Sequence, residues 1–380
     1  MTHNFDRSVW FVTPGYEKHN LQLTTLNFFL FRCIFDLMGR FHYIDAINFA
    51  GKLTFRRVVN AIKLWSSYRL SRLLNRPIQW GYPISVSFEP TTSCNLRCPE
   101  CPSGMRSFTR ATGMLEKNFF QQTIDAMHKE LLYLIFYFQG EPYLHPDFLD
   151  MVQYAASKKI YTATSTNAHY LTDEKAKATV ESGLDRLIIS IDGTAQDVYS
   201  QYRVGGNLEK VIEGTKRVVA WKKQLRSSKP FLVFQFLVVK PNEHQIDDVK
   251  KLAKDIGVDD VWLKTAQVYD YEQDPNGLIP ENNRYSRYKK DHNGRYQPKH
   301  KLSNHCWKLW HSNVITWDGK VTPCCFDKDA QHTLGDLKTA TMKEVWKSKD
   351  YRNFRHLMSK GRKNIDICAN CSEGLKVWED

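Results

Sequence analysis

The sequence lacks any run of about 18 apolar residues, the length that a helix needs to cross a bilayer. It also lacks a basic N-terminal region followed by an apolar core and a small-residue cleavage site, since residues 1–10 are mostly polar. No internal repeat and no low-complexity tract is present. These absences argue against a membrane-spanning, secreted or repetitive protein, and we expect a cytoplasmic chain of 380 residues with two or three domains.

Cysteine is scarce, with nine in the chain, yet three of them occur together as Cys94, Cys98 and Cys101. A CxxxCxxC loop supplies three thiolates to a 4Fe-4S cluster. Because such clusters normally have four Cys ligands, the fourth iron is left open for a substrate or cofactor. Zinc is the alternative, but structural zinc sites use four protein ligands in paired knuckles, and no His lies in this loop.

Strand-like apolar runs alternate with amphipathic segments of helical period, such as residues 118–131 and 246–256. The strand-like runs lie at 84–89, 131–138, 161–166, 186–192, 231–239 and 261–265. This alternation predicts βαβ units and a parallel sheet.

The Cys94 loop resembles the signature of the radical S-adenosylmethionine (SAM) enzymes, and further motifs follow it in that family's order. Gln139-Gly-Glu-Pro142 is similar to the GEP motif, in which backbone carbonyls and the acid receive the SAM ammonium group. By the same resemblance, Ser and Asn side chains at two strand ends face the ribose, and an Arg binds the SAM carboxylate. The residues that the resemblance assigns to SAM are Gly140, Glu141, Ser165, Asn167, Ser190 and Arg203.

The resemblance implies an α/β fold, a partial (β/α)6 barrel of the TIM type with a helical N-terminal extension and a small C-terminal iron–sulfur domain. We expect the mostly helical extension at 1–80, the radical SAM barrel at 81–270, a linker or long loop at 271–301 and the cluster domain at 302–380. In barrels of this kind catalytic groups lie at the C-terminal ends of the strands, which is where the motifs fall. One departure is Glu100, which stands where many members have an aromatic residue near the adenine.

Five cysteines follow the barrel, and Gly319 to Cys324 forms a G-x4-C motif. This tail resembles the SPASM/Twitch extensions that bind auxiliary clusters. A two-cluster module needs more cysteines than this tail has, so we predict one auxiliary 4Fe-4S cluster. Cys325 is left out because neighbouring side chains on an extended stretch point to opposite faces. The predicted ligands are Cys306, Cys324, Cys368 and Cys371, and a zinc site built from the same four is the alternative.

The net charge of +13 is uneven along the chain. Residues 55–76 hold six cations and no acid among apolar residues. Such a helix is compatible with peripheral contact to an anionic membrane surface, but we favour docking on the barrel with its cations solvated. A second basic run at 284–301 includes three tyrosines. No nucleic-acid-binding motif accompanies it, so we favour a solvated loop over a nucleic-acid partner.

The resemblance implies that SAM binds the open iron and is cleaved when a flavodoxin or ferredoxin delivers an electron. The cleavage gives a 5′-deoxyadenosyl radical, which abstracts hydrogen from a substrate. A fully ligated auxiliary cluster suits electron transfer. We therefore expect an oxidoreductase-type reaction, the oxidation of a small polar metabolite such as a sugar. The candidates for a catalytic base are the strand-end residues Glu89, Asp192 and Lys264.

Two alternatives remain open. One is modification of a ribosomally made peptide, although residues 1–80 offer only one strand-like run, Ser8 to Thr13, where peptide modifiers often carry a recognition domain. The other is a catalytically inactive iron–sulfur electron carrier, which would have no use for the SAM motifs.

Overall fold

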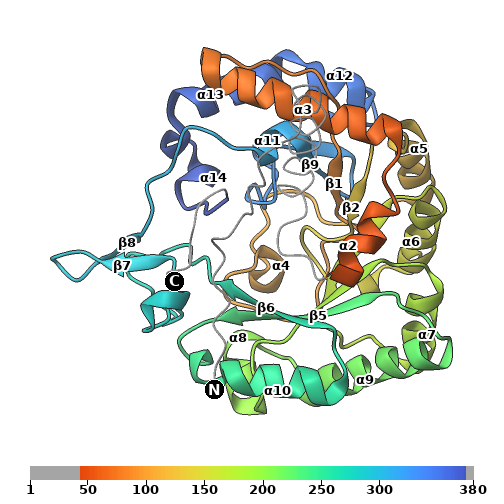
Figure 1. Ribbon diagram of the computed structural model, residues 1–380. Helices are drawn as coiled ribbons and strands as arrows, with labels where there is room; N and C mark the ends of the chain where they lie inside the picture. Colours follow the sequence, from red (N-terminus) through yellow and green to blue (C-terminus); the bar gives the residue numbers. More distant parts are fainter. Residues whose placement is uncertain (1–42, 374–380) are drawn as a thin grey trace, which may run out of the picture. The chain divides into compact units, whose positions relative to one another are not determined.

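The structure is a computed structural model that describes residues 43–373 (Figure 1). These residues belong to one unit of the chain, 41–380. The strand expected at Ser8 to Thr13 lies outside the described residues.

Six parallel strands, paired in chain order, form the centre of the fold. Each lies in a run that the sequence predicts as a strand, give or take one residue. Their burial explains the continuous apolar runs, because a parallel sheet with helices outside is buried on both faces. The strands are β1 (Ser85–Phe88), β2 (Tyr133–Ile135), β3 (Tyr161–Thr166), β4 (Arg186–Ser190), β5 (Phe231–Val238) and β6 (Asp260–Thr265).

Helices connect successive strands, as the predicted βαβ units require. The helix predicted at 246–256 has these bounds, and it ends where Gly257 takes a left-handed conformation with φ of 92°. The connecting helices are α4 (Pro102–Met105), α5 (Lys117–Met127), α6 (Phe148–Ser157), α7 (Asp173–Glu181), α8 (Gln196–Tyr202), α9 (Leu208–Gln224) and α10 (Ile246–Ile256). The mostly parallel sheet and its helices are those of the predicted partial barrel.

The C-terminal segment continues the same sheet. Strand β9 (Ser312–Ile315) pairs in parallel with β1, with Ser312 opposite Ser85, and β10 (Lys320–Thr322) and β11 (Gly335–Asp336) follow in antiparallel pairing. All four residues of β9 are buried, so this strand covers the edge that β1 would otherwise expose. The short helices α11 (Lys308–His311), α12 (Met342–Lys347), α13 (Lys349–Gly361) and α14 (Asp366–Ala369) complete the segment.

Residues 271–301, predicted as a linker or long loop, contain a hairpin of β7 (Tyr288–Lys290) and β8 (Tyr296–Pro298). Figure 1 shows this hairpin projecting away from the main sheet. Its root is anchored by Tyr288, which is buried and stacks on Tyr271 with ring centroids 4.9 Å apart.

The described part of the N-terminal extension is helical, with α2 (Tyr43–Ala50) and α3 (Phe55–Leu74). Helix α3 is the basic helix of the sequence analysis, and it docks on the fold through buried Ala61 and Leu64. The expectation that its cations are solvated is wrong for Arg57, which is 2% exposed. Its guanidinium donates to backbone carbonyls of Lys52, His128, Lys158 and Lys159.

Candidate functional site

The cysteine loop follows β1 at its C-terminal end. Cys101 is the N-cap of α4, and Pro102 begins the helix with the fixed φ that a first turn accepts. Gly104 lets this helix lie against the loop, since an added Cβ would come within 2.6 Å of the backbone N and O of Cys98. The sequence thus fixes the backbone around Cys94, Cys98 and Cys101 by local packing.

Two side chains from later in the chain donate to these sulfur atoms, one just after β3 and one at the C-terminal end of α8. Asn167 Nδ2 lies 3.9 Å from Cys94 Sγ, and Arg203 Nη1 lies 3.7 Å from Cys98 Sγ. Burial raises the pKa of Cys94 to about 11, so this thiol keeps its proton at neutral pH unless iron displaces it. Hydrogen-bond donors aimed at buried sulfur suit a metal-bound thiolate, so the loop fits the 4Fe-4S cluster that the family implies.

Within residues 43–373, no three His, Cys, Asp or Glu side chains converge on a point that one metal ion would occupy. Structural zinc needs four such ligands around a single ion. A cubane cluster instead binds each thiolate at a different iron, which spreads the sulfurs apart. Clusters are the prediction for both cysteine groups, and zinc is the alternative that metal analysis of the protein tests.

The GEP motif supplies a cradle of backbone groups beside this loop. Gly140 has φ of 74°, and an added Cβ would meet the Thr91 carbonyl oxygen at 2.1 Å. Glu141 N donates to the Ser93 carbonyl at 2.7 Å. The motif therefore rests directly on the start of the cysteine loop.

The Glu141 carboxylate is held by hydrogen bonds from the protein itself. It is 2% exposed and accepts hydrogen bonds from Tyr143 N, Thr166 Oγ1 and Asn167 N at 2.7–3.2 Å. Burial raises its pKa. Both oxygens are used to hold the end of β3, so the geometry favours a positioning role for the acid and leaves the backbone to receive an ammonium group.

The three predicted ribose-facing residues come from adjacent strands. Ser165 Oγ of β3 and Ser190 Oγ of β4 lie 3.3 Å apart. Asn167 follows β3 and donates to Asn95 Oδ1 at 2.8 Å, which ties the strand end to the cysteine loop. These three side chains and the cysteine loop thus belong to one edge of the sheet, as the sequence predicts for the C-terminal ends of parallel strands.

Arg203 is held in place by Asp192, one of the three residues that the sequence suggests as a catalytic base. Its Nε donates to Asp192 Oδ2 at 2.5 Å, while Asp192 Oδ1 accepts from Leu237 N at 2.7 Å. Asp192 is fully buried, and burial raises its pKa. Because both of its oxygens are occupied, the geometry supports orientation of Arg203 instead of proton transfer.

Glu89 is engaged in the same way. Its two carboxylate oxygens accept from Arg110 at 2.5 and 2.8 Å, and Trp317 N adds a third bond at 3.3 Å. The residue is completely buried. The geometry therefore favours a brace between the barrel and the C-terminal segment over the catalytic base that we predicted.

Lys264 differs from both acids. It is partly exposed near the end of β6, and no ion pair holds it among the residues that the structure describes. Partial burial of its ammonium group lowers its pKa, and the cations Lys308, Arg287 and Arg186 lower it further, against the opposing effect of Glu373. Glu89 and Asp192, in contrast, are both held in ion pairs.

Glu100 has a structural task. Its Oε2 accepts from Tyr269 N at 2.8 Å, and its backbone carbonyl accepts from Lys328 Nζ at 3.4 Å. The residue thereby ties the cysteine loop to the segment after β6 and to the C-terminal segment, which accounts for an acid at this position.

The four predicted auxiliary ligands, Cys306, Cys324, Cys368 and Cys371, line one cavity of about 320 Å³ including its mouth. Cys325 does not line it and instead accepts from Lys308 Nζ at 3.3 Å. Burial raises the pKa of Cys306 to about 11 and of Cys368 to about 12. Four thiols around one cavity, two of them buried and two half-buried, fit a fully ligated 4Fe-4S cluster.

Sequence reasoning missed the groups that support these sulfurs. Arg362 Nη2 donates to Cys371 Sγ at 3.2 Å, and Lys308 contacts both Cys325 and Glu373. Arg110 was missed as the partner of Glu89. No motif marks these residues, because each contact depends on where the folded chain brings a flexible cation.

Comparisons with known proteins agree with this geometry. The model of the radical SAM superfamily matches residues 88–256, and the SPASM model, an iron–sulfur cluster-binding domain, matches residues 306–372. Together they contain every residue that we predict as a cluster or SAM ligand.

Among curated proteins, the chain is 28% identical over 320 residues to a tungsten-containing aldehyde ferredoxin oxidoreductase cofactor-modifying protein of Pyrococcus furiosus, covering 75% of this chain and 86% of that one. It is 24% identical over 190 residues to the PqqA peptide cyclase of Bradyrhizobium diazoefficiens, covering 50% of this chain and 48% of the cyclase. The chain thus spans about half the length of the second relative.

Among solved structures, Streptococcus suis SuiB bound to S-adenosylmethionine has a TM-score of 0.57 at 13% identity, covering 78% of this chain and 72% of SuiB. This likeness establishes the shared fold. Among residues 43–373, no helix combines the length and apolar character that a membrane crossing needs.

Proposed function

Since the chain belongs to the radical SAM superfamily and carries a SPASM-type iron–sulfur domain after its barrel, we propose that it is a maturase that modifies a ribosomally made peptide. The site's cofactors are SAM, a 4Fe-4S cluster with an open iron and an auxiliary 4Fe-4S cluster. When bound, SAM and the first cluster supply a 5′-deoxyadenosyl radical for hydrogen abstraction.

One observation carries the proposal that the site is catalytic. Asn167, which follows β3, and Arg203, at the C-terminal end of α8, donate to two cysteines of the loop at 3.9 and 3.7 Å. A protein that only stored electrons would need the thiolates but not a guanidinium held beside them by a buried acid. This arrangement supports SAM binding and disfavours the inactive electron carrier.

The chain's own residues would position the cofactor. Arg203, oriented by Asp192, offers a planar cation for the SAM carboxylate. Gly140 gives the backbone room to approach the methionyl ammonium. Ser165 and Ser190 present adjacent hydroxyls for the ribose. Such positioning matters because a primary radical reacts with whatever C–H bond lies nearest.

A peptide is favoured over the small sugar-like metabolite that we first expected. Two of the curated relatives are a peptide cyclase and a cofactor-modifying protein, and neither name indicates a sugar substrate. Lys264, exposed near the mouth of the barrel with a lowered pKa, is our candidate to take a proton from the substrate radical. The auxiliary cluster would then accept the electron.

The experiment is an anaerobic incubation of reconstituted protein with SAM, dithionite and carbon-deuterated substrates in two arms. One arm holds a pool of deuterated ribosomally made precursor peptides, and the other holds deuterated sugars and aminocyclitols. We expect mass spectrometry to find deuterium in 5′-deoxyadenosine only in the peptide arm. Transfer from the sugar arm alone would overturn the peptide assignment, and no 5′-deoxyadenosine in either arm would overturn the enzyme assignment.

A further inference from the structure

The β7–β8 hairpin presents an excess of positive charge. Between residues 284 and 301 there are five exposed cations: Arg284, Lys289, Lys290, Arg295 and Lys301. The one acid in this stretch, Asp291, accepts from Asn293 N and Arg295 N within the hairpin turn, at 2.8 and 3.0 Å. No ion pair of these five cations with another described residue is recorded. The hairpin therefore has a large excess of positive charge, of which Glu281, just before it, offsets only part through its interaction with Lys290.

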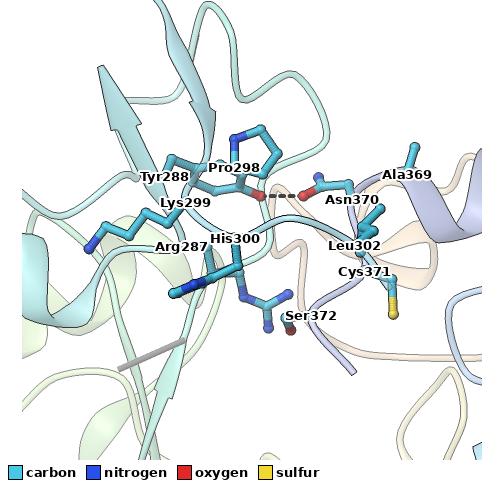
Figure 2. A pocket seen from close by; sticks show the side chains of 10 residues that line it. All are labelled: Arg287, Tyr288, Pro298, Lys299, His300, Leu302, Ala369, Asn370, Cys371 and Ser372. Atoms are coloured by element: carbon cyan, nitrogen blue, oxygen red, sulfur yellow. Dashed lines mark hydrogen bonds between the residues drawn. The ribbon is translucent and has the colours of Figure 1, made fainter. Parts of the chain in front are cut away.

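The root of the hairpin contacts the loop that supplies two auxiliary ligands. Tyr288 OH donates to Asn370 Oδ1 at 2.8 Å, and Figure 2 shows this bond at the edge of a pocket. Asn370 lies between Cys368 and Cys371, and its Nδ2 donates to the Val268 carbonyl at 2.7 Å. The hairpin and the ligand loop are thus joined by a short chain of hydrogen bonds.

The pocket in Figure 2 lies between the hairpin root and the loop of Cys371. Arg287, Lys299 and His300 line it on the hairpin side, and Cys371 lines it on the other. Cys371 also lines the cavity of the four predicted ligands. The pocket at the hairpin root and that cavity therefore share Cys371.

Tyr288 also belongs to the apolar cluster that contains Leu96 and Cys98 of the first cysteine loop. The hairpin root therefore contacts the loop of Cys368 and Cys371 directly and shares an apolar cluster with the first cysteine loop. This is a suitable position for a surface through which electrons enter or leave, since transfer requires close approach of the redox centres.

We infer that the β7–β8 hairpin is the docking surface for an acidic low-potential electron carrier of the ferredoxin type, which exchanges one electron with the auxiliary cluster beneath it. The carrier is oxidised by one electron and the cluster reduced by one, with no bond made or broken, and the reverse transfer uses the same contact. Opposite charge steers such encounters and gives small, weak interfaces. The inference rests on the proposed function because it requires the auxiliary cluster.

The test compares two double charge reversals in the full-length holoprotein. Lys289→Glu/Lys290→Glu changes the hairpin, and Lys251→Glu/Lys254→Glu makes the same change of net charge at exposed positions of α10. The probe is an oxidised acidic [2Fe-2S] ferredoxin, and the readout is its Kd by biolayer interferometry at low and high salt. Iron content is measured to verify that both variants fold and load their clusters.

We expect the hairpin variant to bind about tenfold more weakly at low salt and to lose most of its salt dependence, while the α10 variant changes less than about twofold. Equal weakening in both variants would overturn the inference, because it would indicate attraction to net charge alone. Unchanged binding in both would overturn it too. A hairpin variant that loses affinity for a single-stranded RNA but not for ferredoxin would assign the surface to nucleic acid instead. The deuterium-transfer experiment uses dithionite as the reductant and needs no protein carrier, so its failure does not affect this binding test. Failure of the proposed function and failure of this inference are therefore distinguishable.

Discussion

At the scale of single residues, buried acids determine how the site is arranged. Glu89, Glu141 and Asp192 lie at the ends of strands, where the sequence suggests catalysis, yet each has its carboxylate oxygens occupied. A buried carboxylate is stable only when it is paired and hydrogen-bonded, so these acids are better suited to fixing their neighbours. The cofactor contacts then fall to Arg203 and to backbone groups.

Gly140 is where a single added carbon should matter most. Replacement by Ala places a Cβ 2.1 Å from the Thr91 carbonyl oxygen, and φ at 74° is already unfavourable for Ala. We expect Gly140→Ala to lower the free energy of unfolding by at least about 3 kcal/mol and to weaken SAM binding. Urea unfolding followed by circular dichroism, and calorimetric titration with SAM, measure these two effects.

The matched control is Gly294→Ala in the hairpin turn. Gly294 has nearly the same φ, 77°, but an added Cβ meets nothing within 4 Å. This change should cost only the backbone strain of about 1–2 kcal/mol and leave SAM affinity unchanged. Equal losses in the two variants would show that strain alone, not the contact with Thr91, governs Gly140.

At the scale of elements, local sequence patterns were sufficient for the barrel strands. The run predicted at 161–166 has the same bounds as β3, because the residues next to it in the sequence determine where the strand begins and ends. The pairing of β9 with β1 was not predicted, since Ser312 and Ser85 are brought together only by the complete fold. The same holds for the site. The cysteines could be predicted because their spacing in the sequence is recognisable, whereas no sequence spacing marks the Asp192–Arg203 pair or the Lys308–Cys325 contact.

Helix α3 offers a test of how an element is attached. Arg57 donates to four backbone carbonyls in the interior. Its neighbour Arg56 has a side chain that is 62% exposed and pairs with Glu130. We expect Arg57→Met to lower the free energy of unfolding by about 3 kcal/mol, because buried carbonyls lose their donor. Arg56→Met should cost less than about 1 kcal/mol.

Urea midpoints of the two Met variants, measured side by side, decide between these roles of the helix. Equal, small losses would mean that water replaces the guanidinium of Arg57, and that α3 is held by its apolar face alone.

At the scale of the whole molecule, the two cysteine groups belong to one sheet. Because β9 pairs with β1, the segment with the auxiliary ligands is attached to the strand that leads into the first cysteine loop. Glu89 and Trp317 reinforce this junction. Tyr288 adds a second connection, because it bonds to Asn370 between Cys368 and Cys371 and shares an apolar cluster with Cys98. The described fold therefore joins the two groups of predicted cluster ligands.

Iron content tests this arrangement in full. Anaerobically reconstituted protein should hold about eight Fe, and Cys94→Ala/Cys98→Ala/Cys101→Ala should leave about four, because each cubane depends on its own thiolates. Cys368→Ala/Cys371→Ala should also leave about four, while Cys325→Ala should keep all the iron, since Cys325 accepts a hydrogen bond from Lys308 and does not line the cavity. Iron, acid-labile sulfide and zinc are measured together. Full iron in the triple variant would contradict the assignment of a cluster to Cys94, Cys98 and Cys101. Zinc in place of four iron atoms would make the C-terminal site a zinc site. Since zinc does not exchange electrons, that result would remove the redox role from the C-terminal segment.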